Sequence, residues 1–287
     1  FGRAQEGVTE VLGGFGESEQ QIVRAATRSP RAVFSGALLQ QKAGGILLEF
    51  IHMVEPAPRP IRRDLRYGDI GVAKITVATA DARSVYERLR GGVGFCSEPK
   101  TTVIPGFGDY EFVYCRDPEG NLIEIVTADE GSGALLGGVR SVGIAVTDLD
   151  RSMPFYRERL GFDVVVLDTH ESFSGLVDEV AGTAGARVRS CLLSAGARGK
   201  GMLELFETLS PRGRSMPFST RWGDFGYLQA AFHCDDIPGI AGQLEAAGMD
   251  LLCSPKAMAE SIPDDPGEFV YVRDPDGIPI EFLFLPE

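Results

Sequence analysis

Four glutamates occupy matched positions in a sequence that repeats itself. Glu49 and Glu204 are 155 residues apart and lie in the similar segments GGILLEF and KGMLELF. Glu124 and Glu281 are 157 residues apart and lie in EFVYCRDPEGNLIEI and EFVYVRDPDGIPIEF, which are identical at ten of fifteen positions. Carboxylates held close together can bind a hard metal ion through oxygen or can transfer protons.

A lysine and a glutamine occupy a further pair of matched positions. Lys74 in GVAKITVATAD corresponds to Gln229 in GYLQAAFHCDD, again 155 residues further on. A lysine flanked by carboxylates can serve as acid, base or anion holder. It can also form a plain ion pair that stops the acids from repelling each other. We weigh the ion pair above the catalytic role and keep both.

Histidine and cysteine are scarce. The chain has three histidines and five cysteines, with no C-x-x-C motif, so a disulfide framework and a Cys-rich zinc site are disfavoured and reduced thiols in a cytoplasmic protein are expected. His233 shares strand parity with Gln229 and is the candidate acid or base. His52 is expected on the face of its strand opposite to Glu49, and His170 in a solvated loop.

Composition narrows the class of protein. The 287 residues suggest two domains, and 44% hydrophobic residues suffice for a buried core. The net charge of -13 argues against nucleic acid or an anionic membrane as partner, because both need clustered Lys and Arg. No apolar run is long enough to span a membrane. A small-molecule ligand is therefore expected, and a homodimer is left open.

Hydrophobic patterning predicts an α+β fold. In the second copy, a strand at 141–147 leads into a helix at 151–160 that Asp148 or Asp150 caps. Further elements are expected as a helix at 237–247 and strands at 162–168, 187–195, 201–208, 227–234, 249–252, 268–272 and 278–285. The order β-α-β-β-β thus occurs twice per copy. We divide the chain into a first domain at 1–128, a Gly-rich linker at 129–138 and a second domain at 139–287.

The pattern resembles the vicinal oxygen chelate (VOC) superfamily, which includes glyoxalase I, bleomycin-resistance proteins and extradiol dioxygenases. The resemblance rests on SVGIAVTDLDRSMPFYRERLGFDVV, on ILLEF and MLELF, and on the two copies of F-V-Y-x-R-D-P-x-G-x-x-I-E. It implies tandem VOC (glyoxalase-like) domains whose paired βαβββ modules form cupped mixed sheets. The counterpart of Ser141 would precede Phe1, so the first module is expected to lack its opening strand and helix.

The resemblance also implies where a site lies. Ligand positions in this family fall on the first and last strands of each module, and pairing modules within each copy gives two cups. The first would hold Glu49, Lys74 and Glu124, and the second Ser141, Glu204, Gln229 and Glu281. The candidate catalytic residues are Lys74, Glu124 and His233; the candidate substrate-binding residues are Ser141, Gln229 and Trp222; the candidate metal ligands are Glu49, Glu124, Glu204 and Glu281.

Two functions follow from the resemblance. One is an enzyme with lyase or isomerase chemistry on a small oxygenated molecule, using one divalent metal (Zn, Fe, Mn, Ni or Co) or, without a metal, Lys74 in its place. The other is a non-catalytic protein that sequesters an aromatic or drug-like ligand. Ring-cleaving dioxygenase activity is disfavoured, because Ser141 and Gln229 stand where that activity needs histidines. Segment 209–225, which contains Trp222, either covers a cup or packs as a linker.

Overall fold

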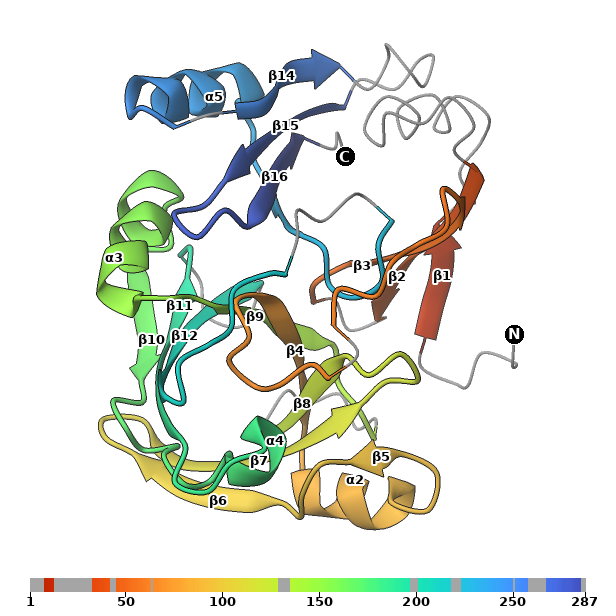
Figure 1. Ribbon diagram of the computed structural model, residues 1–287, viewed down its shortest axis with the longest axis vertical. Helices are drawn as coiled ribbons and strands as arrows, with labels where there is room; N and C mark the ends of the chain where they lie inside the picture. Colours follow the sequence, from red (N-terminus) through yellow and green to blue (C-terminus); the bar gives the residue numbers. More distant parts are fainter. Residues whose placement is uncertain are drawn as a thin grey trace.

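The computed structural model describes residues 8–12, 33–41, 45–62, 64–128, 135–196, 201–217, 223–249, 251–257 and 267–284. Its strands form three sheets, of three, nine and four strands (Figure 1). The nine-stranded sheet curves through the lower part of this view, and the other two lie above and beside it.

The nine-stranded sheet combines strands from both copies of the repeat. Its order is β10-β11-β12-β9-β4-β8-β7-β5, with β6 paired to β7. At the join, β9 runs parallel to β12 and antiparallel to β4. The strands are β4 (Gly71–Thr79), β5 (Gly94–Phe95), β6 (Lys100–Ile104), β7 (Gly108–Arg116), β8 (Leu122–Thr127), β9 (Val139–Ala145), β10 (Val164–Asp168), β11 (Arg187–Ser194) and β12 (Met202–Ser210).

The other two sheets contain the outer parts of the chain. The order β1-β2-β3 joins β1 (Val8–Leu12), β2 (Val33–Gln41) and β3 (Leu48–Glu55). The order β13-β16-β15-β14 joins β13 (Ala230–His233), β14 (Leu251–Ala257), β15 (Glu268–Arg273) and β16 (Pro279–Phe284). In the nine-stranded sheet, β9 lies between β12 and β4 and joins the two copies. Among the described residues, no strand joins β3 to β13 in this way.

Short helices pack against the sheets, and the one at Asp178–Ala181 packs on the concave face of the nine-stranded sheet. They are α2 (Ala82–Leu89), α3 (Leu149–Pro154), which continues into the π-helical turn η1 (Phe155–Arg159), α4 (Asp178–Ala181) and α5 (Ile237–Ala246). Asp81, Asp148 and Asp236 cap α2, α3 and α5 by accepting hydrogen bonds from backbone N–H groups. No helix in the described ranges is long and apolar enough to cross a membrane.

Alternation along β12 separates two parts of the core. Leu203 and Leu205 belong to the cluster that packs α3, η1 and α5 between the nine-stranded and four-stranded sheets. Met202 and Phe206 belong to a second cluster on the opposite, concave face. Because successive strand residues point to opposite faces, Glu204 faces into the concave side together with Met202 and Phe206.

The predicted fold class is confirmed, and one detail of its assembly is corrected. The elements between 139 and 284 lie at the predicted places, including the cap at Asp148. The modules, however, pair across the predicted linker 129–138, since β4 hydrogen-bonds to β9. The cups therefore do not follow the predicted division of the chain. In both copies of the repeat, the arginine before the turn, Arg116 or Arg273, donates to the carbonyl of the turn glycine, Gly120 or Gly277.

Candidate functional site

Lys74 on β4 lies between two carboxylates inside the concave face of the nine-stranded sheet, which we call the lysine cup. Its Nζ is 2.8 Å from Glu124 Oε2 and 2.8 Å from Glu204 Oε2. The three side chains are 0%, 1% and 7% exposed, in that order. A buried ammonium therefore bridges the two acids and offsets one of their two negative charges, in the position where a bound cation would otherwise lie.

The surroundings of Lys74 keep it charged. Its Nζ donates to Tyr114 Oη at 3.0 Å and lies within 5.8 Å of the ring centroids of Tyr67, Tyr114 and Phe206. Burial by itself would lower the pKa of Lys74, but the charges of Glu124 and Glu204 outweigh it and hold the pKa well above its usual value. Lys74 is therefore a fixed cation at neutral pH and not a free base.

Glycine at position 143 makes room for this lysine. Gly143 on β9 is the cross-strand partner of Lys74 on β4. A Cβ at Gly143 would lie 2.5 Å from Lys74 Cγ and 2.9 Å from Lys74 Cε. Real Cβ atoms do not approach that closely, so the glycine in the middle of this strand is explained by close approach of a side chain.

The lysine cup is closed by residues 169–186, which connect β10 to β11 and which we call the plug segment. Phe173 packs against Tyr110 and Phe112, with ring centroids 5.4 and 5.1 Å apart. A hydrogen bond from a side chain to the backbone helps to hold the segment in place, because Thr102 Oγ1 donates to the Ser172 carbonyl at 3.1 Å. An organic substrate therefore has no open path to Lys74 along this side.

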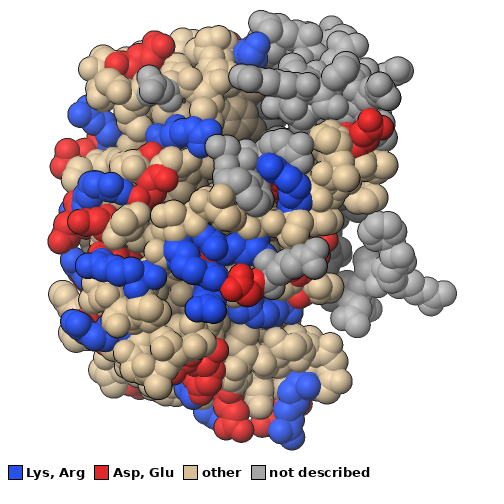
Figure 2. All heavy atoms as spheres, in the orientation of Figure 1, with Lys and Arg blue, Asp and Glu red and all other residues tan. Residues whose placement is uncertain are grey.

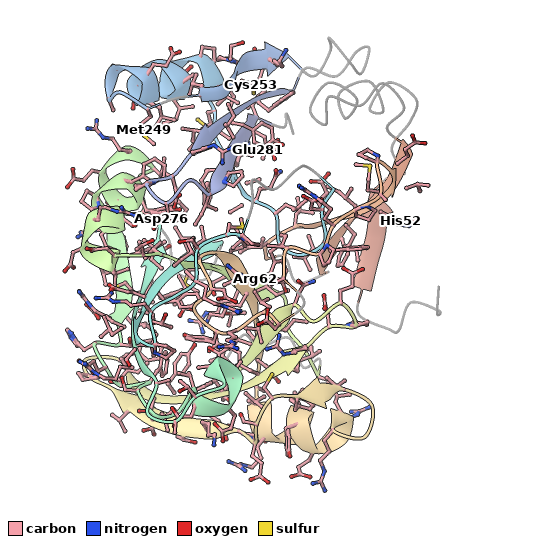
Figure 3. The ribbon with its side chains drawn as sticks, viewed as in Figure 1. His52, Arg62, Met249, Cys253, Asp276 and Glu281 are labelled. Carbon is pink, nitrogen blue, oxygen red and sulfur yellow. The ribbon has the colours of Figure 1, made fainter. Side chains whose placement is uncertain are left out.

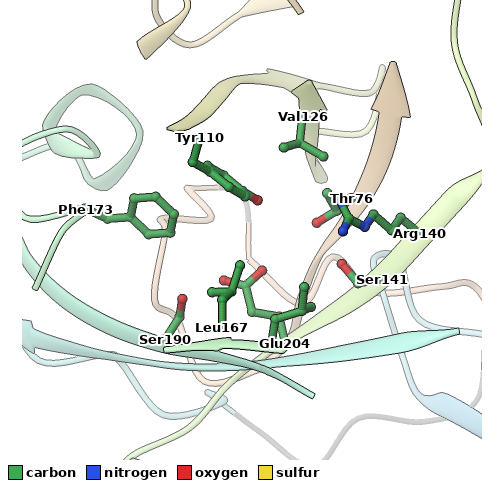
Figure 4. A pocket seen from close by; sticks show the side chains of 10 residues that line it. Thr76, Tyr110, Val126, Arg140, Ser141, Leu167, Phe173, Ser190 and Glu204 are labelled. Carbon is green, nitrogen blue, oxygen red and sulfur yellow. The ribbon is translucent and has the colours of Figure 1, made fainter. Parts of the chain in front are cut away.

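A small cavity remains beneath the plug segment. It measures about 10 Å³, and its walls include Tyr110, Arg140, Ser141 and Glu204 (Figure 4). That volume is roughly the space of one water molecule. The lysine cup thus offers no room for an organic ligand, and its central position, already taken by Nζ, does not fit a metal ion.

The second cup lies between β3 and the four-stranded sheet, and we call it the acid cup. Gln229 Nε2 donates to Glu281 Oε2 at 2.8 Å and to Tyr271 Oη at 3.2 Å. The negative charge of Glu49 on β3 raises the pKa values of Glu281 and Tyr271. Glu49 therefore lies close enough to this group to act on it electrostatically. Glu281 is half-buried and Glu49 exposed. Two acids therefore share this cup with an uncharged amide.

The two cups are built from the same repeat positions. Tyr114 pairs across the strands with Glu124, as Tyr271 pairs with Glu281. In order, Lys74, Tyr114, Glu124 and Glu204 of the lysine cup correspond to Gln229, Tyr271, Glu281 and Glu49 of the acid cup. Lys74 contacts the tyrosine and the last-strand glutamate of its cup, and so does Gln229 in the acid cup. At this equivalent position one cup therefore has a cation and the other has an amide.

This single difference changes the chemistry of the paired glutamate. Burial raises the pKa of Glu281 to about 7, and the negative charge of Glu49 adds to that rise while the Tyr271 hydroxyl opposes it. The pKa of Tyr271 lies well above its usual value because of burial and the charge of Glu281. Glu281 can therefore gain and lose a proton near neutral pH, while Tyr271 stays a hydrogen-bond donor.

The predicted grouping of the acids is corrected by the structure. Glu204, and not Glu49, joins Lys74 and Glu124, while Glu49 faces Glu281. Ser141 likewise lies in the lysine cup, next to Glu204 and not next to Gln229. The physical reason is the pairing of β4 with β9, which builds one cup from the second and third modules and leaves the first and fourth modules to form the other.

None of the described histidines lies among these acids. His233 is on β13 with a side chain that is 57% exposed, and its Nδ1 is 3.7 Å from Asp235. His52 is exposed on β3, on a different sheet from Glu281 (Figure 3). His170 is exposed beside Asp168. Trp222, a predicted substrate-binding residue, lies outside the described residues.

Sequence reasoning missed the two tyrosines and Gly143. Tyr114 and Tyr271 occur in the identical FVY of the repeated segment, so the repeat itself carried the signal. Thr76, whose hydroxyl donates to Glu124 at 2.8 Å, follows Lys74 by two residues and therefore shares its face. These groups explain how Glu124 can be almost completely buried.

The described side chains of the acid cup do not form the ligand set of a metal ion. The described residues place two carboxylates and one amide there, and the amide N–H groups point at Glu281 and Tyr271. Nowhere in the described ranges do three or more His, Cys, Asp or Glu side chains gather as metal ligands. These residues do not fit a metal centre, and the chemistry below is derived from the side chains themselves.

Comparisons with known proteins agree with this architecture. The chain aligns with a point mutant of glyoxalase I from Zea mays at 17% identity and a TM-score of 0.66, over 96% of this chain and 83% of that one. Unmutated Zea mays glyoxalase I gives 16% identity and 0.62, over 94% and 89%. A putative dioxygenase from Bacillus subtilis gives 14% identity and 0.54, over 94% and 82%. At these identities the likeness concerns the fold alone.

The sequence itself identifies the family. No curated protein matches the chain. The family model for the Glyoxalase/Bleomycin resistance protein/Dioxygenase superfamily matches residues 138–282, about half of the chain, which include β9 to β13 and most of the four-stranded sheet. The chain belongs to the Glyoxalase/Bleomycin resistance protein/Dioxygenase superfamily.

Proposed function

We propose that this chain is a lyase or isomerase that removes a proton from a small oxygenated organic molecule in the acid cup. The observation that carries the proposal is the pKa of Glu281, which burial raises to about 7. A general base works best when its pKa lies near the working pH, and strongly perturbed acids cluster at functional sites. In the lysine cup burial also raises the pKa of Glu204, but Glu204 Oε2 is bound to Lys74 Nζ at 2.8 Å and the plug segment closes that cup to a substrate.

The residues of the acid cup suit the two halves of such a step. Glu281 takes a proton from a carbon next to a carbonyl group: the C–H bond breaks, an O–H bond forms on Glu281, and the electron pair moves to the carbonyl oxygen. The Gln229 amide donates to Glu281 at 2.8 Å and to Tyr271 Oη at 3.2 Å, so a substrate carbonyl that replaces Tyr271 as acceptor would receive an amide N–H that stabilises the charge on its oxygen. Return of the proton to the neighbouring carbon gives an isomer, and loss of a neighbouring group gives a lyase product.

Proton exchange tests this function without knowledge of the product. A panel of α-hydroxy aldehydes, α-hydroxy ketones and vicinal diketones is incubated with the protein in D2O, and loss of the α-proton signal is followed by NMR. We expect exchange with at least one compound, rising as pH passes through about 7. Glu281→Gln should abolish it.

A matched control is available on the next strand. Glu268→Gln removes a carboxylate from β15 at an odd spacing from Tyr271, so on the face turned away from it. It should leave exchange unchanged. Exchange that survives in Glu281→Gln, or that is lost equally in Glu268→Gln, would contradict the proposal.

Non-catalytic binding of an aromatic or drug-like ligand is the alternative function. One observation favours it: one of the two cups is already filled by an internal ion pair and by the plug segment. Saturable binding of a panel member with no proton exchange would decide for this alternative. A cytoplasmic location and a homodimer stay predictions; the five cysteines are free thiols, which suits a reducing compartment.

A further inference from the structure

A larger cavity lies away from both cups, where the two segments that join the outer sheets to the nine-stranded sheet meet. The described parts of these segments are residues 56–62 and 64–70, between β3 and β4, and residues 211–217 and 223–229, between β12 and β13. The cavity measures about 250 Å³. We call it the linker cavity. It shares no lining residue with the groups around Lys74 or Glu281.

Ion pairs between the two segments hold the walls of this cavity in place. Arg214 binds Asp69 through two hydrogen bonds of 2.7 and 2.6 Å, and Asp69 is 4% exposed. Arg59 binds Asp224 in the same two-pronged way, at 3.1 and 2.7 Å. Tyr227 Oη donates to the Leu122 carbonyl at 3.1 Å and anchors the far wall. A cavity whose walls are fixed beforehand binds a ligand with little loss of entropy.

The lining combines an apolar body with one arginine and two acids, of which Asp69 is already bound by Arg214 and the other is Glu119. Most of the wall is aliphatic or aromatic and includes Ile61, Ile70, Val72, Met216, Phe225 and Tyr227. The cation is Arg62, whose side chain is only 11% exposed. Arg62 lies near the middle of the view in Figure 3. In the same orientation, Figure 2 shows Lys and Arg side chains gathered over the centre of the molecule.

Arg62 keeps hydrogen-bonding capacity for a ligand. Its Nη2 donates to the carbonyls of Arg214 and Ser215, and its Nε is 3.6 Å from Asp69, which Arg214 already binds at shorter distance. No acceptor among the described residues is bonded to Arg62 Nη1. On another wall, the amide group of Asn121 donates to Asp117 at 2.8 Å, which leaves its carbonyl oxygen beside Gly226 as an acceptor.

We propose that the linker cavity binds a small carboxylate with an apolar, ring-sized body. A guanidinium recognises a carboxylate through charge-assisted hydrogen bonds, which are about twice as strong as neutral ones. The apolar walls exclude water from the body of the ligand. The volume suits a molecule with one ring, because it falls just below the usual range for drug-sized ligands.

Hydrocinnamate and its neutral amide, hydrocinnamamide, test the proposal on the full chain by isothermal titration calorimetry. We expect saturable binding of hydrocinnamate that is about tenfold tighter than that of the amide. Arg62→Gln should remove this preference, and Arg62→Lys should keep part of it. Arg83→Gln, which changes an exposed arginine on α2, should bind both compounds like the parent protein.

A second variant keeps the test independent of Arg62 and its backbone contacts. Met216→Trp places a larger side chain into the cavity wall and should weaken both compounds about tenfold or more, with the unfolding temperature little changed. Equal binding of carboxylate and amide to the parent protein, or no binding at millimolar ligand, would overturn the proposal. So would Met216→Trp binding both compounds as tightly as the parent. None of these outcomes depends on proton exchange at Glu281.

Discussion

Replacement of Lys74 by methionine isolates the contribution of the buried ammonium. The variant keeps most of the side-chain volume but leaves Glu124 and Glu204, which are 1% and 7% exposed, without a cation. Removing one partner of a buried ion pair usually costs about 3–5 kcal/mol, because the remaining charge is left uncompensated. We expect a loss of that size in the free energy of unfolding at pH 8, measured by urea denaturation.

The pH dependence of this loss identifies its cause. Glu124 still accepts hydrogen bonds from Thr76 and Tyr114, whereas the second carboxylate oxygen of Glu204 has no partner among the described residues. Burial already raises the pKa of Glu204 in the parent protein while Lys74 opposes that rise, so in Lys74→Met the folded-state pKa of Glu204 should rise further above its unfolded value. A raised carboxyl pKa destabilises as pH rises through that window, so the loss should shrink by about 1.4 kcal/mol per pH unit on going down towards pH 5.

Two further variants serve as controls for Lys74→Met. Lys100→Met removes a lysine whose ion pair with Glu179 is partly exposed and should cost less than about 1 kcal/mol. The double variant Lys74→Met, Glu204→Gln should recover part of the loss at pH 8, because only Glu124, which still accepts hydrogen bonds from Thr76 and Tyr114, then remains without a cation. If Lys74→Met and Lys100→Met lose equal stability, or if the loss at Lys74 does not change between pH 8 and pH 5, the reasoning is refuted.

Two other predictions concern the same matched positions. Gly143→Ala should lower the free energy of unfolding by about 1–3 kcal/mol, because its Cβ would lie 2.5 Å from the immobile Lys74 side chain; Gly94→Ala, on a strand with open space around it, should change it little, and equal losses would contradict this account. The protein should lose stability between about pH 5 and pH 8, because the folded-state pKa of Glu281, about 7, exceeds its unfolded value. Glu281→Gln should gain about 1–3 kcal/mol at pH 8 by urea denaturation. Part of the slope should remain in this variant, because burial also raises the pKa of Asp274, to about 6, and the pKa values of Glu49 and Glu204.

The internal repeat made most of the fold predictable. The two copies of F-V-Y-x-R-D-P-x-G-x-x-I-E place a turn between two strands, and both turns are found as expected. Alternation along the strands also gave the facing direction of residues such as Glu204 and Lys74. These are local properties, set by propensity, capping and the two-residue period of a strand, and each can be read from a few neighbouring residues.

The partners of each glutamate could not be read in the same way. A repeat shows which positions are equivalent, but not which of four equivalent units pack together. Pairing depends on long-range contacts between β4 and β9, and nothing in the local pattern of Lys74 states that Glu204 will approach it from the other copy. The prediction therefore identified these acids but wrongly grouped Glu49 with Lys74.

The central claim is that an amide at position 229, where the equivalent position has a lysine, leaves Glu281 free to exchange a proton near neutral pH. The most direct measurement is a carbon-13 NMR titration of the Glu281 carboxyl group in the parent protein and in Gln229→Lys. We predict a midpoint of about 7 in the parent and a clearly lower midpoint in Gln229→Lys, because the ammonium would stabilise the carboxylate. An ordinary glutamate midpoint in the parent, or the same midpoint in both proteins, would contradict the account.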